Sequence, residues 1–189
     1  MVRSLQCFFV LLLLGVQPAA EATTLKAGET HRLTFRDVDG NDLSTSDGHV
    51  TIITVVTRRS EEKARAISKL VPDRCIGDPK YRYVTLVNFQ RGLARPLHGM
   101  TRAIIRSRLD SEAKGLQSQY TAKKLTRDPR SDVYVVADFD GSAVTRLGMS
   151  PESNDVAAFV FNGSGKLVQR WIDVPPGDSL ATAIAAAER

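Results

Sequence analysis

The sequence predicts an α/β protein in which a mixed sheet is covered by helices on both faces. The first observation behind this is the continuous β-branched run 50–56, as expected for a strand buried on both faces. The second is that strand-like runs alternate with helical stretches, which implies parallel pairing through right-handed crossovers. The third is an Asn-Gly-Ser-Gly turn at 162–165 between two strand-like runs, which indicates a closing antiparallel hairpin.

The first half of the chain contains two predicted strands and one predicted helix. Residues 32–38 alternate polar and apolar side chains and lead into an Asp-Gly turn, which is typical of a hairpin strand. The buried strand 50–56 follows. A helix is expected over 60–70, because Ser60 can cap its first turn and apolar residues then recur at helical spacing. Pro72 should end it.

The second half begins with a strand-like run at 83–89 and a crossover of about forty residues that ends near Ser131. Apolar residues recur every three or four positions within the crossover and predict a long helix. They are Ile105, Leu109, Ala113, Leu116 and Tyr120. The remaining predicted elements are a buried strand at 133–137, a short helix at 143–147, hairpin strands at 157–161 and 167–172, and a last helix from Asp178 or Ser179 to Ala187.

The first 22 residues have the pattern of a cleavable export signal. Arg3 gives a short positive region, and an apolar run from Phe8 to Val16 follows it. This run is too short to cross a hydrocarbon core, which needs ~20 residues. Small residues then lead to a cleavage site after Ala22, with cleavage after Ala20 as the alternative. The sequence therefore predicts a signal peptide at 1–22, one domain at 23–189 and a periplasmic or secreted location.

Two hairpins carry a resemblance to a known family. Residues 35–44 pass from an apolar strand through an Asp-Gly turn, and a loop ending in Gly48 then precedes the buried strand. Residues 159–171 form the closing hairpin, which a terminal amphipathic helix follows. Over nearly all of 23–189 these patterns resemble the thioredoxin-like superfamily, in particular its peroxiredoxin and membrane-tethered thioredoxin branches. The resemblance implies a thioredoxin-like mixed sheet with an N-terminal β-hairpin extension and a long helical crossover.

The resemblance also places the redox site of the family at the end of the first buried strand. The family has two cysteines there, two residues apart, at the start of a helix that lowers the thiol pKa. The matching stretch in this chain is Thr57-Arg58-Arg59-Ser60. The cis-proline of the family would fall near Asn154 or Asp155, whereas the nearest proline, Pro151, comes too early. Both redox determinants of the family are therefore missing.

These replacements predict a redox-inactive protein that works by binding. Neither Thr57 nor Ser60 can form a disulfide, so the usual disulfide exchange is excluded on chemical grounds. Two arginines stand at the expected N-terminus of a helix, a position that suits anions or a peptide carboxylate. The candidate binding residues are Thr57, Arg58, Arg59, Ser60 and Asn154.

Two enzymatic alternatives stay open. Cys75 is the one cysteine left in 23–189, and a thiol redox enzyme could use it if Arg74 favours the thiolate; the simpler interpretation is a buried apolar residue. The run Asp138-Phe139-Asp140-Gly141-Ser142 is similar to the nucleophile motif of magnesium-dependent phosphohydrolases of the haloacid-dehalogenase type. A strand that ends in an Asp-Gly turn explains this run more simply.

Positive charge is concentrated in the crossover. The formal net charge of the chain is +5, and the segment 91–130 has ten basic residues against three acidic ones. The basic residues are Arg91, Arg95, Arg102, Arg106, Arg108, Lys114, Lys123, Lys124, Arg127 and Arg130. They predict either an anionic or protein partner or a solvated helix face; the segment lacks aromatic residues interleaved with the basic ones, which would favour nucleic acid. No cofactor is expected, and His31, His49 and His98 are too far apart to indicate a metal site.

Overall fold

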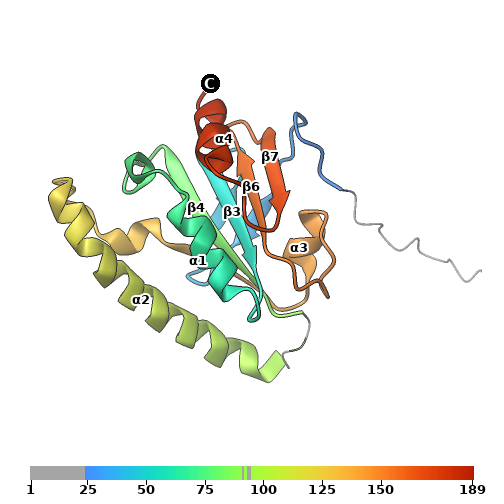
Figure 1. Cartoon of the computed structure of the whole chain (residues 1–189). Coiled ribbons are helices and arrows are strands. Elements are labelled where there is room, and N and C mark those ends of the chain that lie inside the picture. Colours follow the sequence, from blue (N-terminus) through green and yellow to red (C-terminus); the bar gives the residue numbers. More distant parts are fainter. Residues whose placement is uncertain (1–23, 91, 93–94) are drawn as a thin grey trace, which may run out of the picture.

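A computed structural model describes residues 24–90, 92 and 95–189 and is built around a five-stranded sheet (Figure 1). The central strand, β3 (Val50–Val56), pairs in parallel with β4 (Tyr81–Asn88), which pairs in parallel with β5 (Tyr134–Asp138). On its other side β3 pairs antiparallel with β6 (Ala157–Phe161), and β7 (Leu167–Ile172) completes the hairpin. The mixed sheet and the closing hairpin expected from the sequence are confirmed.

Both faces of the sheet are covered. One face has α1 (Glu61–Lys69), α2 (His98–Ala122) and α4 (Ser179–Ala187), and the other has α3 (Ser142–Arg146) and a ribbon of β1 (Thr34–Arg36) and β2 (Asp42–Ser44). Successive residues of β3 pack on opposite faces of the sheet, because successive side chains of a strand point in opposite directions. Ile52 belongs to the cluster of Ile67 and Ile184, whereas Ile53 belongs to the cluster of Phe35 and Val144.

The long crossover helix expected from the sequence is confirmed as α2, which has 25 residues and follows a short 3₁₀ turn, η2 (Arg95–Leu97). Its buried residues are Leu109, Ala113 and Tyr120. Leu109 packs against Val135 of β5, so the helix covers the β4–β5 side of the sheet. The chain then returns through η3 (Pro129–Asp132) into β5. Figure 1 shows α2 running along the outer side of the molecule.

The N-terminal hairpin is shorter than the pattern at 32–38 indicates. The carboxylate of Asp37 accepts hydrogen bonds from the backbone N–H groups of Asp39 (2.9 Å) and Asn41 (2.8 Å), so the chain turns one residue after β1. Val38 then donates its N–H to the carbonyl of Val135 at 2.9 Å. This bond attaches the ribbon to β5, and the hairpin extension is a separate two-stranded sheet beside the main one.

All helices and strands of the described residues lie between Thr34 and Ala187, so residues 23–189 contain the whole core that the structure describes. The signal peptide predicted at 1–22 lies outside the described residues and stays a prediction. Among the residues that the structure describes, no helix combines the length and the apolar character needed to cross a bilayer.

Candidate functional site

The carboxyl ends of β3, β4 and β5 meet at one edge of the sheet, because the three strands are parallel. Polar residues that follow or end these strands are buried there. They are Thr57 and Ser60 after β3, Asn88 at the end of β4 and Asp138 at the end of β5, each no more than 5% exposed. Buried polar groups need hydrogen-bond partners, so their contacts reveal what this edge can do.

The turn after β3 is closed by hydrogen bonds between Thr57 and Ser60. The Thr57 N–H donates to Ser60 Oγ at 2.8 Å, and the two side-chain oxygens lie 3.2 Å apart. The Ser60 N–H donates in turn to the carbonyl of Thr57 at 3.1 Å, and the Arg59 N–H donates to Thr57 Oγ1 at 3.3 Å. Residues 57 and 60, predicted to replace the cysteine pair, are therefore in direct contact.

The Ser60 side chain does not cap α1 in the way that the sequence indicates. Ser60 is the residue directly before the helix, but its hydroxyl bonds back to Thr57 instead of to the first turn of α1. The tight turn brings the Thr57 N–H to 2.8 Å from this hydroxyl, and no side-chain cap bond to α1 forms. Both hydroxyls are thus used within the turn, and the contacts recorded for them include no base that would activate either one.

Arg58 and Arg59 are both exposed at the tip of this turn. They stand directly before α1, whose first turn contains Glu61 and Glu62. Glu61 forms an ion pair with Arg65 at 2.8 Å. Two cations thus project from the start of a nine-residue helix, as the sequence predicts.

Asn154, the remaining predicted site residue, is attached to the end of β4. Gln90 donates its side-chain amide to Asn154 Oδ1 at 3.1 Å and to the carbonyls of Glu152 and Ser153. Asn88 donates to the carbonyl of Pro151 at 2.8 Å, so two amides fasten the loop before β6. Sequence reasoning missed Asn88 and Gln90, because their partners lie more than 60 residues away.

The residue directly before β6 is Val156 rather than Asn154 or Asp155, since β6 begins at Ala157. Val156 is buried, and no peptide bond in the described residues is cis. Val55 pairs with Ala157 across β3 and β6, so this position lies at the same edge of the sheet as the Thr57–Ser60 turn. A buried aliphatic residue thus stands at the start of the strand where the resemblance leads one to expect a proline.

Asp138 and Asp140, the phosphohydrolase candidates, hold the turn before α3. Asp138 accepts a hydrogen bond from the N–H of Val144, and Asp140 accepts one from the N–H of Ser142, both at 2.9 Å. Burial raises the pKa of Asp138, whereas hydrogen bonds from Ser142 lower the pKa of Asp140. Both carboxylates thus have structural partners, and no group of three or more metal-ligating side chains occurs among the described residues.

Cys75 lies at the opposite edge of the sheet. It ends the 3₁₀ turn η1 (Asp73–Cys75), which precedes the start of β4, whereas the Thr57–Ser60 turn follows the end of β3. Its side chain is buried in the same cluster as Ile67 and Ile184. Burial raises the pKa of the thiol, although Arg74 works against this. A raised pKa is the opposite of what a nucleophilic cysteine needs.

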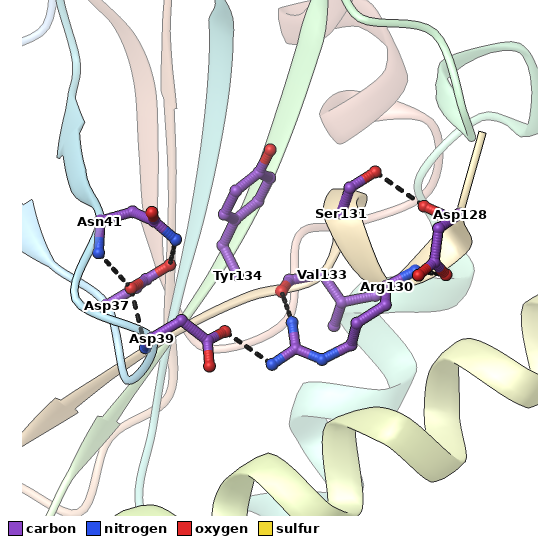
Figure 2. A pocket seen from close by; sticks show the side chains of 8 residues that line it. All are labelled: Asp37, Asp39, Asn41, Asp128, Arg130, Ser131, Val133 and Tyr134. Atoms are coloured by element: carbon purple, nitrogen blue, oxygen red, sulfur yellow. Dashed lines mark hydrogen bonds and ion pairs between the residues drawn. The ribbon is translucent and has the colours of Figure 1, made fainter.

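Some basic side chains of the crossover form ion pairs with acidic residues of the same chain, and Figure 2 shows the pair of Arg130 and Asp39. Arg130 contacts Asp39 at 2.6 Å and Asp110 at 3.0 Å, and Arg106 contacts Asp39 at 3.2 Å. A cavity of about 390 Å³ lies beside these pairs, lined by residues of the hairpin turn and of η3 that include Asp37 and Arg130. Arg106 and Arg130 thus bind the hairpin turn, whereas Lys123 pairs with Asp73 and Arg127 pairs with Asp132.

Comparison with known proteins finds likeness in structure alone. No protein-family model matches the sequence, and no curated protein matches it either. A peroxiredoxin-like protein from Aquifex aeolicus has a TM-score of 0.52 at 12% identity, covering 87% of this chain and 89% of its own. A thiol:disulfide interchange protein DsbE from Chlorobium tepidum has a TM-score of 0.51 at 12% identity, covering 87% and 99%. The exposed lipoprotein thioredoxin Etrx1 from Streptococcus pneumoniae has a TM-score of 0.51 at 14% identity, covering 82% and 99%.

Proposed function

Because the chain has the thioredoxin-like fold that its sequence predicts, we propose that it is an exported, redox-inactive thioredoxin-like domain that binds a protein or anionic partner. The observation that carries the proposal is the turn after β3. Two hydroxyls, 3.2 Å apart and almost fully buried, occupy the positions where the resemblance expects a cysteine pair.

The chemistry of this turn supports binding over electron transfer. A disulfide exchange needs a thiolate that attacks and a second sulfur that resolves the mixed disulfide. Thr57 and Ser60 supply neither, and their hydroxyls already bond to each other and to the backbone. What the turn presents to solvent is Arg58 and Arg59 at the N-terminus of α1, where the helix dipole also favours an anion.

A disulfide-reduction assay tests the redox part of the proposal. Residues 23–189 should not accelerate the reduction of insulin disulfides, and a Cys75→Ser variant should behave identically. The double variant Thr57→Cys/Ser60→Cys should form an intramolecular disulfide, because the two side chains already touch in one turn. Insulin reduction by the parent that is lost in Cys75→Ser would overturn the proposal in favour of a one-cysteine enzyme.

Affinity capture tests the binding part. Residues 23–189 should recover a partner from the extracytoplasmic fraction of the producing cell, and Arg58→Ala/Arg59→Ala should lose it. The matched control is Arg65→Ala/Lys69→Ala, which removes the same charge from exposed positions on α1. Equal recovery by the parent and the Arg58/Arg59 variant would remove the turn from the interaction.

Export is supported by the sequence pattern at 1–22 and by the description of one similar structure as an exposed lipoprotein. N-terminal sequencing of the protein from the producing cell tests it. The expected first residue is Thr23, or Glu21 if cleavage follows Ala20. Recovery of the intact chain from the cytoplasm alone would contradict export.

A further inference from the structure

A second cavity, of about 320 Å³, lies between the hairpin turn and α2. Three of the residues that line it are arginines: Arg36 at the end of β1, and Arg102 and Arg106 on α2. Arg102 and Arg106 are four residues apart and therefore lie on the same side of the helix. We call these three side chains the arginine cluster. Two elements far apart in the sequence thus bring positive charge to one cavity.

Contacts within the chain hold the two arginines of α2 on the inner side of the helix. The guanidinium carbon of Arg102 lies 5.0 Å from the centre of the Phe139 ring. Arg106 Nε donates to Asp39 Oδ1 in the hairpin turn at 3.2 Å. Both side chains are therefore positioned before a ligand arrives, which lowers the entropy that is lost on binding.

The arginine cluster has more positive charge than its surroundings neutralise. Asp37 is the acidic residue among the described lining residues, and its carboxylate accepts hydrogen bonds from N–H groups of Asp39 and Asn41. In the part of the chain that the structure describes, Arg36 and Arg102 form no ion pair; Arg36 Nε donates to a backbone carbonyl of the turn. Guanidinium groups that share one cavity repel one another, so this cavity favours an anion.

A phosphate monoester matches this cavity better than a carboxylate does. The fork of a single guanidinium group can already bind both oxygens of a carboxylate. The phosphate of a monoester has three terminal oxygens and a charge of about −1.5 to −2 at pH 7, which suits three guanidinium groups. The volume of the cavity falls in the range of small-molecule sites, about 300–1,000 Å³, so an organic group fits beside the phosphate.

We propose that the arginine cluster binds a small phosphate monoester. The phosphate contacts the three guanidinium groups, and the organic group lies against Val38, Gly40 and Ala137, which complete the described lining. None of these lining residues belongs to the Thr57–Ser60 turn, so the inference does not depend on the partner proposed for that turn.

Isothermal titration calorimetry of residues 23–189, the part that contains the whole described core, tests this proposal with glucose 6-phosphate as the probe. The parent should bind the probe, and high salt should weaken the binding. Arg36→Gln/Arg102→Gln should bind at least about tenfold more weakly, because two of the three guanidinium groups are lost. The matched control, Arg32→Gln/Arg108→Gln, removes the same charge from exposed positions outside the cavity and should bind like the parent. Circular dichroism should show that both variants fold.

Further probes and one further variant identify the ligand group and the site. Glucose lacks the phosphate, succinate replaces it with carboxylates, and inorganic phosphate lacks the organic group. Each of the three should bind at least about tenfold more weakly than glucose 6-phosphate. Arg58→Ala/Arg59→Ala should keep the affinity of the parent, because these arginines do not line the cavity.

Five results would overturn the proposal. The first is the absence of binding by the parent at millimolar glucose 6-phosphate, and the second is equal affinity of Arg36→Gln/Arg102→Gln and its control. Succinate that binds as tightly as glucose 6-phosphate would indicate a carboxylate site, and equally tight inorganic phosphate would indicate a site for free phosphate. Loss of binding in Arg58→Ala/Arg59→Ala would assign the probe to the turn after β3 instead.

Discussion

At the scale of single residues, the Thr57–Ser60 turn shows how two hydroxyl side chains after a strand become part of the core. Thr57 is 2% exposed, and its N–H has Ser60 Oγ as its partner. A buried N–H that loses its only partner destabilises the folded state by the desolvation penalty of that group. The Ser60 hydroxyl therefore has a structural value that is independent of any ligand.

Replacing Ser60 with alanine should destabilise the protein by about 1–3 kcal/mol, because it leaves the Thr57 N–H buried without this partner. Urea unfolding monitored by fluorescence or circular dichroism measures the change. The control is Ser68→Ala on the same helix, whose exposed hydroxyl bonds to the carbonyl of Arg65 and should matter by less than ~0.5 kcal/mol. Equal effects of the two substitutions would contradict the role given to Ser60.

Cys75 should make the stability depend on pH above neutrality. Burial raises the pKa of the folded thiol, so the unfolded chain loses this proton first, near pH ~8.5. The contribution is fully present below that pH, and the free energy of unfolding should fall as pH rises toward 10, by at most ~1.4 kcal/mol per unit.

Urea unfolding at a series of pH values measures this slope, and Cys75→Ala should reduce it. The comparison is confined to pH below 10, because Tyr81 and Tyr120, whose pKa values are raised to about 12, begin to contribute above it. An unchanged slope in Cys75→Ala would show that the thiol titrates alike in both states.

Residue positions in the site were predictable where they follow directly from a strand. The end of β3 is evident from its β-branched run, so the sequence places Thr57 and Ser60 correctly. The partners of Asn88 and Gln90 were not predictable, since their amides bind main-chain carbonyls of a distant loop, and carbonyls carry no sequence signal. The hydroxyl of Ser60 bonds backward for a similar reason, because the geometry of the turn decides its partner.

At the scale of elements, Arg130 joins three parts of the chain. Its guanidinium group donates to Asp39 in the hairpin turn, to Asp110 in α2 and to the carbonyl of Val133 before β5. The side chain is only 22% exposed, so these bonds are partly shielded from water. A planar guanidinium spreads five donors over three nitrogens and so reaches partners that lie far apart, whereas the three donors of a lysine all leave one nitrogen.

Arg130→Lys should therefore lower the free energy of unfolding by about 1–2 kcal/mol although the charge is kept. Arg108→Lys provides the control, because Arg108 is exposed on α2 and its replacement should change stability by less than ~0.5 kcal/mol. Urea unfolding of the two variants and the parent measures both values. A loss in Arg130→Lys no greater than in the control would mean that charge alone accounts for the contact.

The helices and inner strands were predictable because their apolar patterns are long. The sequence did not predict where the first strand of the N-terminal hairpin ends. The pattern at 32–38 continues beyond Arg36, but the side chain of Asp37 forms the turn and ends β1. The exposed side of α2 was also missed. Helical periodicity finds one apolar face, and Met100 and Ile104 do not belong to it.

At the scale of the whole molecule, folding should not respond to the redox state. Residues 23–189 contain one cysteine, and its side chain is buried in the core. The thermal midpoint of this protein should be the same with and without dithiothreitol, within the error of a melting curve. The Thr57→Cys/Ser60→Cys variant is the matched comparison, because its disulfide should be reduced by the same treatment.

A shift of the parent midpoint on reduction would contradict this expectation and would point to an intermolecular disulfide through Cys75. Size-exclusion chromatography under both conditions distinguishes that case, since a disulfide-linked dimer elutes earlier. The test reports on the folded protein as a whole rather than on the turn after β3.

The overall fold was predictable because the order of strands and helices admits few sheet topologies once right-handed crossovers are required. Which basic side chains form ion pairs and which face the solvent was not predictable to the same degree. A count of arginines over 91–130 cannot tell Arg130, held by two carboxylates, from exposed Arg108. Only the packing of the hairpin turn against α2 separates them.

The place of β6 in the chain also determines when the sheet can close during synthesis. β3 ends at Val56, but its neighbour β6 begins at Ala157, about 100 residues later. At about 5–20 residues per second, roughly 5–20 s separate the emergence of these two strands from the ribosome. During that interval the central strand has no partner on one side, so the sheet can close only after β6 has emerged.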